Sequence, residues 1–167
     1  MSAHRFPPRA FWAAAGVAFA VDQISKLAVV HGMDLRNRLA IDVLPPLLNF
    51  RMGWNEGINF GLLAGSPDAM RWALVLLAAG ISLALALWSR GLARTLARVA
   101  AGLVAGGAMA NALDRLLYGA MADFLNMSWW GIANPYAFNL ADVFIFAGAA
   151  GLILWGDSRN AARSKTP

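Results

Sequence analysis

Four apolar stretches, each long enough to cross a lipid bilayer, constrain the fold of this chain more than any other feature. A helix needs about 20 mostly apolar residues to span the hydrocarbon core, with a range of roughly 17–25. Residues 10–30, 70–88, 97–117 and 138–155 meet this requirement. Because 59% of the 167 residues are hydrophobic and only 14% are charged, the chain is too apolar for an ordinary soluble domain of this size. We therefore expect an all-α membrane protein, with four transmembrane helices in a single domain that covers residues 1–167.

The charged residues between the predicted spans are distributed unequally over the two sides. One side is basic and holds Arg5, Arg9, Arg90, Arg94, Arg98, Arg159, Arg163 and Lys165, opposed only by Asp157. Arginine and lysine accumulate in the cytoplasmic loops of membrane proteins. Both termini are therefore expected in the cytoplasm, with an uncleaved first span, while residues 31–69 and the segment after Tyr118 face outward. The net charge is +5, but the basic residues form no face of their own, so we do not expect nucleic-acid binding.

The stretch between the first two predicted spans differs from the rest of the chain. Residues 39–60 mix alternating apolar positions, the pair Pro45-Pro46 and several glycines, which favours a small outward-facing segment, β-rich or irregular, on the membrane surface. Trp129 and Trp130 are also expected at the outer surface. They belong either to an aromatic belt at the headgroup layer or to a route for a lipid-attached substrate.

The polar residues near the predicted spans limit the possible chemistry to carboxylates and amides. The chain has no cysteine, its two histidines lack a serine and carboxylate partner set, and there is no metal-ligand pattern. Asp123 follows the third span on the outer side, and Asp142 lies just inside the outer end of the fourth. Two neighbouring carboxyl groups can share one proton and so supply an acid and a base to activate water. Ion pairing or helix capping is the alternative interpretation of such acids.

Asp114, Asp22 and Lys26 are further charged residues within the predicted spans. Asp114, one turn from Asn111 and directly before Arg115, is expected to be a buried charge held by hydrogen bonds. Asp22 and Lys26 stand four residues apart on a helix and are expected to form a structural ion pair. A different class of function stays open, because Asp114, Asp123 and Asp142 are also the acids that a small proton-coupled carrier or channel would use.

Five sequence blocks, in order along nearly the whole chain, resemble the bacterial lipoprotein signal peptidase family, also called signal peptidase II. They are DQISK at residues 22–26, NEGINFG at 55–61, GGAMANALDR at 106–115, ADF at 122–124 and FNLAD at 138–142. The resemblance implies an intramembrane aspartic endopeptidase of the bacterial inner membrane. Such an enzyme removes the signal peptide from prolipoproteins, just before a cysteine that carries diacylglycerol.

The resemblance also implies roles for individual residues. Asp123 and Asp142 match the catalytic pair of the family, without metal or cofactor. The polar residues around that pair are matched by Asn111, Asp114, Arg115 and Asn139, and the substrate-contacting block of the outward loop by Asn55, Gly57 and Phe60. The implied partners are prolipoprotein substrates and membrane lipids, and we expect a monomer.

Two positions depart from the family pattern. Asn59 stands where a small residue is usual, and Ala110 stands where glycine is common before Asn111. Asn59 affects the expected substrate preference, because it lies in the substrate-contacting block. A relative that binds lipidated peptides without cutting them would carry the same two acids, so only an assay separates it from a peptidase.

Overall fold

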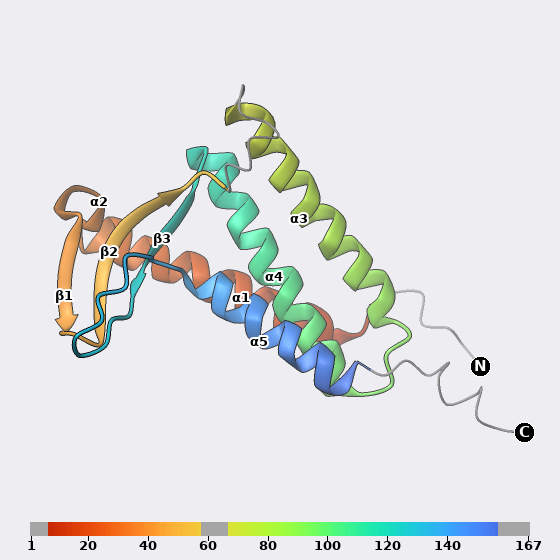
Figure 1. The fold of residues 1–167 in the computed structure, drawn as a ribbon. Helices are drawn as coiled ribbons and strands as arrows, with labels where there is room; N and C mark the ends of the chain where they lie inside the picture. Colours follow the sequence, from red (N-terminus) through yellow and green to blue (C-terminus); the bar gives the residue numbers. More distant parts are fainter. Residues whose placement is uncertain (1–6, 58–66, 157–167) are drawn as a thin grey trace, which may run out of the picture.

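The computed structural model describes residues 7–57 and 67–156, which form a helical bundle with a small sheet at one end (Figure 1). The helices are α1 (Arg9–Lys26), continued as the π-helix η1 (Leu27–Gly32), α2 (Leu35–Arg38), α3 (Pro67–Ser89), α4 (Thr95–Tyr118) and α5 (Leu140–Trp155). The strands are β1 (Ala40–Leu44), β2 (Leu48–Asn55) and β3 (Met121–Asn126).

Each predicted span coincides with a helix to within a few residues. Among the described residues, α1 with η1, α3 and α4 are long and apolar enough to cross a membrane. The fourth, α5, is also apolar but has only 16 residues. The structure thus contains three candidate membrane helices and one shorter apolar helix.

Helix α4 occupies the centre of the bundle and packs against α1, α3 and α5. Glycines make this close packing possible, because side chains larger than hydrogen would collide with neighbouring backbone. A Cβ atom at Gly106 would meet the backbone of Ala15 in α1, and one at Gly107 would lie 2.6 Å from the carbonyl oxygen of Ala141 in α5. The small residues therefore set the distances between the helices that carry polar side chains.

The three strands form one antiparallel sheet in the order β1-β2-β3. The expectation of a β-rich segment between the first two spans is correct for β1 and β2, and the sheet contains a further strand that was not predicted. The third strand follows α4, and Asp123 lies on it. Five of its six residues are buried, so its sequence lacks the alternation of apolar and polar residues that identifies a half-exposed strand.

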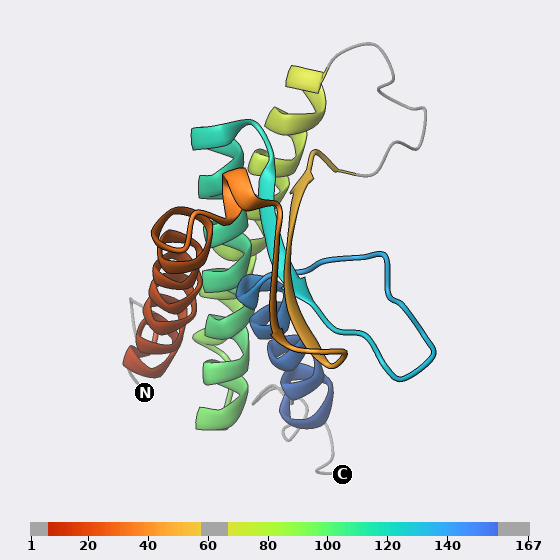
Figure 2. The ribbon, with the colours of Figure 1, turned by 90° about the vertical axis from the view of Figure 1, so that its left-hand side faces the viewer.

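Strand β3 connects two distant parts of the helical bundle. It starts next to the end of α4, runs across the bundle beside β2, and leads through residues 127–137 to the start of α5 (Figures 1 and 2). Leu125 exchanges backbone hydrogen bonds with Phe138, two residues before α5. This return path brings the sheet and the N-terminus of α5 together.

Candidate functional site

Asp123 and Asp142 reach the same region from two different elements. Asp123 is 4% exposed and lies in the middle of β3, whereas Asp142 is in the first turn of α5. Asn139 is the residue that starts this helix, and its side chain accepts the backbone N–H of Asp142 at 3.0 Å. In return, the backbone N–H of Asn139 donates to Asp142 Oδ2 at 3.2 Å. This reciprocal capping box fixes Asp142 relative to the backbone.

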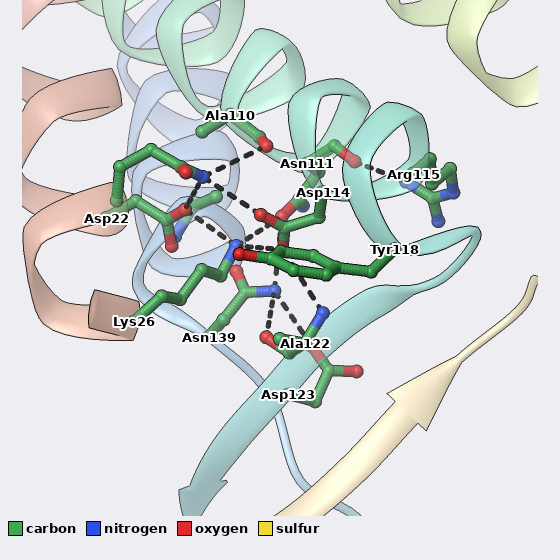
Figure 3. Close-up of polar contacts among 12 residues, drawn as sticks. Asp22, Lys26, Ala110, Asn111, Asp114, Arg115, Tyr118, Ala122, Asp123 and Asn139 are labelled. Atoms are coloured by element: carbon green, nitrogen blue, oxygen red, sulfur yellow. Dashed lines mark hydrogen bonds and ion pairs between the residues drawn. The ribbon is translucent and has the colours of Figure 1, made fainter. Parts of the chain in front are cut away.

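One amide side chain connects the two acids. Asn139 Nδ2 donates to Asp123 Oδ1 at 2.8 Å, while Asn139 Oδ1 holds the N–H of Asp142. Asn139 is fully buried, and Figure 3 shows its side chain directed between α4 and β3. The single residue Asn139 therefore binds both acids and fixes their positions relative to each other.

The remaining carboxylate oxygens also accept hydrogen bonds from uncharged donors. Asn55 Nδ2 donates to Asp123 Oδ2 at 3.1 Å, and Asn111 Nδ2 donates to Asp142 Oδ1 at 3.0 Å. Amide donors orient a carboxyl group, but they stabilise its charge less than a cation would. The arrangement thus fixes the positions of both acids and leaves them able to exchange a proton.

The electrostatic surroundings of Asp123 favour its protonated form. Burial raises the pKa of Asp123 to about 6; the hydrogen bond from Asn55 opposes this rise, while the neighbouring charge of Asp142 adds to it. Because the two groups interact, the proton belongs to the pair rather than to one residue. Asp123 can therefore hold a proton at mildly acidic pH, near its pKa of about 6.

A network of buried charges lies behind the acid pair. Lys26 Nζ is 2.6 Å from Asp22 Oδ2 and 2.7 Å from Asp114 Oδ2, and it also donates to Asn111 Oδ1 at 3.2 Å. Asp22 and Lys26 come from α1, whereas Asn111 and Asp114 come from α4 (Figure 3). One lysine thus joins two carboxylates on two helices.

Each of these two carboxylates holds the backbone beside a member of the acid pair. Asp22 Oδ1 accepts the N–H of Ala141, the residue before Asp142, at 2.8 Å. Asp114 Oδ2 accepts the N–H of Ala122, the residue before Asp123, at 3.1 Å. The charge network consequently supports both acids through their own main chains.

Arg115 lies beside the acids but forms no salt bridge with them. Its Nη1 donates to the backbone oxygen of Asn111 at 3.2 Å. Its Nε is buried and has no hydrogen-bond partner within the described part of the chain. The Nε–H of Arg115 is therefore an unpaired donor in the described structure, where buried polar groups are normally paired.

A cavity of about 400 Å³ opens onto Asp123 from the sheet side. It is lined by Gly53, Trp54, Asn55, Glu56, Gly57, Asp123, Pro135, Tyr136 and Ala137. Gly57 has φ +110 and donates its N–H to Asn55 Oδ1 at 3.0 Å, so a residue without a side chain allows the turn that orients the amide of Asn55. Phe60 and Asn59 lie outside the described residues.

Two features of the site were not identified in the sequence. Gln23 Nε2 donates to Asp114 Oδ1 at 3.0 Å and to the carbonyl oxygen of Ala110 at 3.2 Å. A polar residue in an apolar span was the available signal for it. The backbone N–H groups of Ala122 and Ala141 carry no signal in the sequence.

In residues 7–57 and 67–156, there is no cluster of three or more potential metal ligands.

Comparison with known proteins gives consistent matches over most of the chain. The sequence model of the family described as Signal peptidase (SPase) II matches residues 14–156. A lipoprotein signal peptidase of Aeromonas hydrophila is 37% identical over 169 residues, covering 100% of this chain and 99% of the relative. Another, from Rhodopseudomonas palustris, is 38% identical over 140 residues and covers 82% of this chain and 85% of the relative.

Two solved structures have a similar fold. Both are described as bacterial membrane enzymes. One superposes with a TM-score of 0.72 at 25% identity and covers 86% of this chain and 90% of the other. The second has a TM-score of 0.69 at 24% identity over 86% of this chain and 85% of the other. The likeness of fold therefore extends over most of the chain.

Proposed function

This chain belongs to the signal peptidase II family, and on that premise we propose that Asp123 and Asp142 are its catalytic pair. It is a protease of the lipoprotein signal peptidase class, whose substrates are lipoprotein precursors. The observation that carries the proposal is the double contact of Asn139, which holds the carboxylate of Asp123 and the backbone of Asp142 at once. The adjoining cavity, which Asp123 lines, gives an extended peptide access to the pair.

Hydrolysis follows from a pair of carboxyl groups that holds one proton. The charged member removes a proton from water, whose oxygen then bonds to the carbonyl carbon of the scissile peptide. The protonated member donates to the carbonyl oxygen, and a proton is later delivered to the leaving nitrogen as the C–N bond breaks. The pKa of Asp123, raised to about 6, supports a shared proton at mildly acidic pH.

The residues around the pair divide into substrate contacts and supports. Asn55, Gly57 and Phe60 belong to the substrate-contacting block. The Nε–H of Arg115, which has no partner among the described residues, is suited to a carbonyl oxygen of a bound peptide. Asn111, Asn139, Asp114, Asp22 and Lys26 keep the acids in place.

We further propose that the preferred cleavage point lies just before a cysteine carrying diacylglycerol. The cavity opens at the sheet end of the bundle, so a lipid-anchored cleavage point can reach Asp123 from the bilayer surface. In this arrangement α1, α3, α4 and α5 all cross the inner membrane, both termini are cytoplasmic, and a monomer contains every residue of the site.

The carrier function is not favoured. The match is to a peptidase family, and Asp114, which a proton relay would need, is already bound by Lys26, Gln23 and the N–H of Ala122. A residue with both oxygens engaged is a poor relay. The reconstituted protein is thus expected to cut a precursor and to carry no proton current.

The deciding experiment is cleavage of a diacylglyceryl-modified prolipoprotein by the purified protein in lipid. We expect cleavage by the parent and loss of cleavage in Asp123→Asn and Asp142→Asn, because an amide can neither accept nor donate the proton. Asp42→Asn, an exposed acid of the same sheet that pairs with Arg51, is the matched control and should cut normally.

Other outcomes would contradict specific parts of the proposal. Full activity in either asparagine variant would remove that acid from the pair. If the folded parent bound the precursor without cutting it, the chain would be a relative that binds lipidated peptides but is not a peptidase. Equal cleavage of the unmodified precursor would refute the role of diacylglycerol.

A further inference from the structure

The sheet ends in two apolar tips on the side away from the helices α3 and α4. One tip is the hairpin of residues 43–48 between β1 and β2, and the other is the loop of residues 127–137 after β3. Since Asn49 pairs with Asn126, both tips leave the same end of the sheet, and Figures 1 and 2 show them next to each other. Their exposed side chains form the sheet-tip patch: Leu44, Met127, Trp129, Trp130, Ile132 and Tyr136. Each of these side chains is more than half exposed.

Both tips are free of charged residues. No Asp, Glu, Lys, Arg or His occurs in residues 43–48 or in the whole stretch 124–141. Asp42 and Arg51, which lie on the strands of the hairpin next to its tip, pair with each other at 2.6 Å. An exposed apolar patch of this kind marks a binding surface, since soluble surfaces are normally interrupted by charge.

Uncharged side chains in and beside the loop of residues 127–137 pair part of its backbone. Asn126 Nδ2 donates to the carbonyl oxygens of Asn134 and Tyr136 at 2.7 and 2.8 Å, and Ser128 Oγ accepts the N–H of Asn134 at 3.1 Å. Trp129 and Ile132 exchange backbone hydrogen bonds at 3.0 and 2.9 Å. These bonds reduce the number of unpaired backbone groups and so lower the cost of placing the loop in a water-poor layer.

The two tips do not reach as far along the bundle as the end of α4 and the start of α3. Helix α5 begins level with Gly107, where α4 touches Ala141, and α4 continues for eleven residues more, to Tyr118. This is about 16 Å along the helix at 1.5 Å per residue. The start of α3 reaches the same end, because Arg71 donates to the carbonyl oxygen of Leu116 at 2.8 Å. In both ribbon views the hairpin and the loop lie beside the bundle and short of these helix ends (Figures 1 and 2).

We propose that the sheet-tip patch is inserted into the interfacial layer of the phospholipid leaflet at the sheet end of the bundle. The partner is lipid rather than protein, because the patch lies at the depth of the leaflet that surrounds α3 and α4. Tryptophan and tyrosine are favoured in this layer, where an apolar ring and a polar edge are both accommodated. The sheet then acts as a second membrane anchor that holds the cavity at Asp123 against the lipid surface.

The absence of cysteine allows a direct test with single nitroxide labels. Leu44→Cys and Ile132→Cys place one label on each tip, and Arg36→Cys places the control on the exposed face of α2. Each labelled protein is reconstituted without precursor into phosphatidylcholine nanodiscs, one molecule per disc. Collisions of the label with oxygen, which concentrates in lipid, are compared with collisions with a water-soluble nickel chelate.

We expect the ratio of oxygen to nickel collisions to be several-fold higher at positions 44 and 132 than at position 36. A ratio at both tips equal to that at position 36 would overturn the proposal. A high ratio at only one tip would overturn the two-tip anchor as stated. Thermal unfolding of each labelled protein establishes that it is folded, and the outcome is independent of whether the protein cuts a precursor.

Discussion

The side chains that bind the two acids are amides, and this choice has a chemical consequence. The carboxyl groups of Asp123 and Asp142 accept hydrogen bonds from three amides, those of Asn55, Asn111 and Asn139. The cation Lys26 does not contact this pair and is bound instead by Asp22 and Asp114. A lysine in direct contact would hold a carboxylate in its charged form. Neutral donors fix the geometry and still permit protonation.

The amide of Asn55 should control the pH range of activity. Its Nδ2–H stabilises the charged form of Asp123 and so lowers the pKa of that group. In Asn55→Ala, the pKa of Asp123 should therefore rise above its value of about 6, and the pair should keep its proton to higher pH. We expect the alkaline limb of the pH profile of kcat/KM to move to higher pH, with a lower maximum because a substrate contact is also lost.

Asn49→Ala is the control for this measurement, because Asn49 lies on the same strand but donates to the carbonyl oxygen of Pro46. It should leave the alkaline limb in place. An unchanged limb in Asn55→Ala would show that Asp123 does not set it.

Lys26 should be essential for stability because two buried carboxylates depend on it. Lys26→Met leaves Asp22 and Asp114 without a cation, and breaking a buried ion pair in this way costs about 3–5 kcal/mol. We expect a loss of this size in the free energy of unfolding, measured in detergent micelles. In the triple variant Asp22→Asn, Lys26→Met and Asp114→Asn, most of the loss should be recovered.

The recovery is expected because the asparagine oxygens can still accept the N–H groups of Ala141 and Ala122 while no buried charge remains. If the triple variant were as unstable as Lys26→Met, uncompensated charge would not be the cause of the loss.

At the scale of the elements, the site depends on how closely α5 approaches α4. Asp142 is bound by Asn111 across this contact, and the contact itself rests on Gly107. The reciprocal bonds of Asn139 and Asp142 fix only the start of α5. The position of the helix on its neighbour is decided by packing.

Gly107→Ala should therefore damage activity by moving α5. The new methyl group would lie 2.6 Å from the carbonyl oxygen of Ala141 and 3.0 Å from Ile145. Overpacking of this kind costs about 1–3 kcal/mol, and the displacement should lengthen the bond between Asn111 and Asp142. We expect a reduced kcat together with reduced thermal stability.

Gly80→Ala provides the matched control, because nothing lies within 4 Å of a Cβ at that position of α3. Alanine favours a helix over glycine by about 1 kcal/mol, so this variant should be at least as stable as the parent and fully active. Equal behaviour of the two variants would show that the close contact at Gly107 has no role.

For the molecule as a whole, the charge distribution predicts the orientation in the membrane. Arg36→Cys places a thiol on α2 at the sheet end, and Ala93→Cys places one in the turn between α3 and α4. A membrane-impermeant maleimide added to intact spheroplasts should label position 36 and not position 93. The opposite pattern would reverse the orientation proposed from the basic loops.

The sequence alone determined the helical parts of this protein and the identity of its polar blocks. Apolar runs of sufficient length specify helices in any packing, because a backbone in lipid must satisfy its hydrogen bonds internally. The two acids could be named since charged residues beside such runs are costly and therefore informative, whereas Asn55, Asn111 and Asn139 were assigned to the site by the resemblance to the signal peptidase II family. Hence α1, α3, α4 and α5 were located to within a few residues.

Only the tertiary structure decided how those residues meet. Strand β3 could not be predicted, because both its faces are buried and its partner β2 lies far away in the sequence. The support of Asp123 and Asp142 by Asp114 and Asp22 passes through the backbone N–H groups of Ala122 and Ala141. A backbone group is the same in every residue, so such contacts depend on the path of the chain in space and leave no trace in its composition.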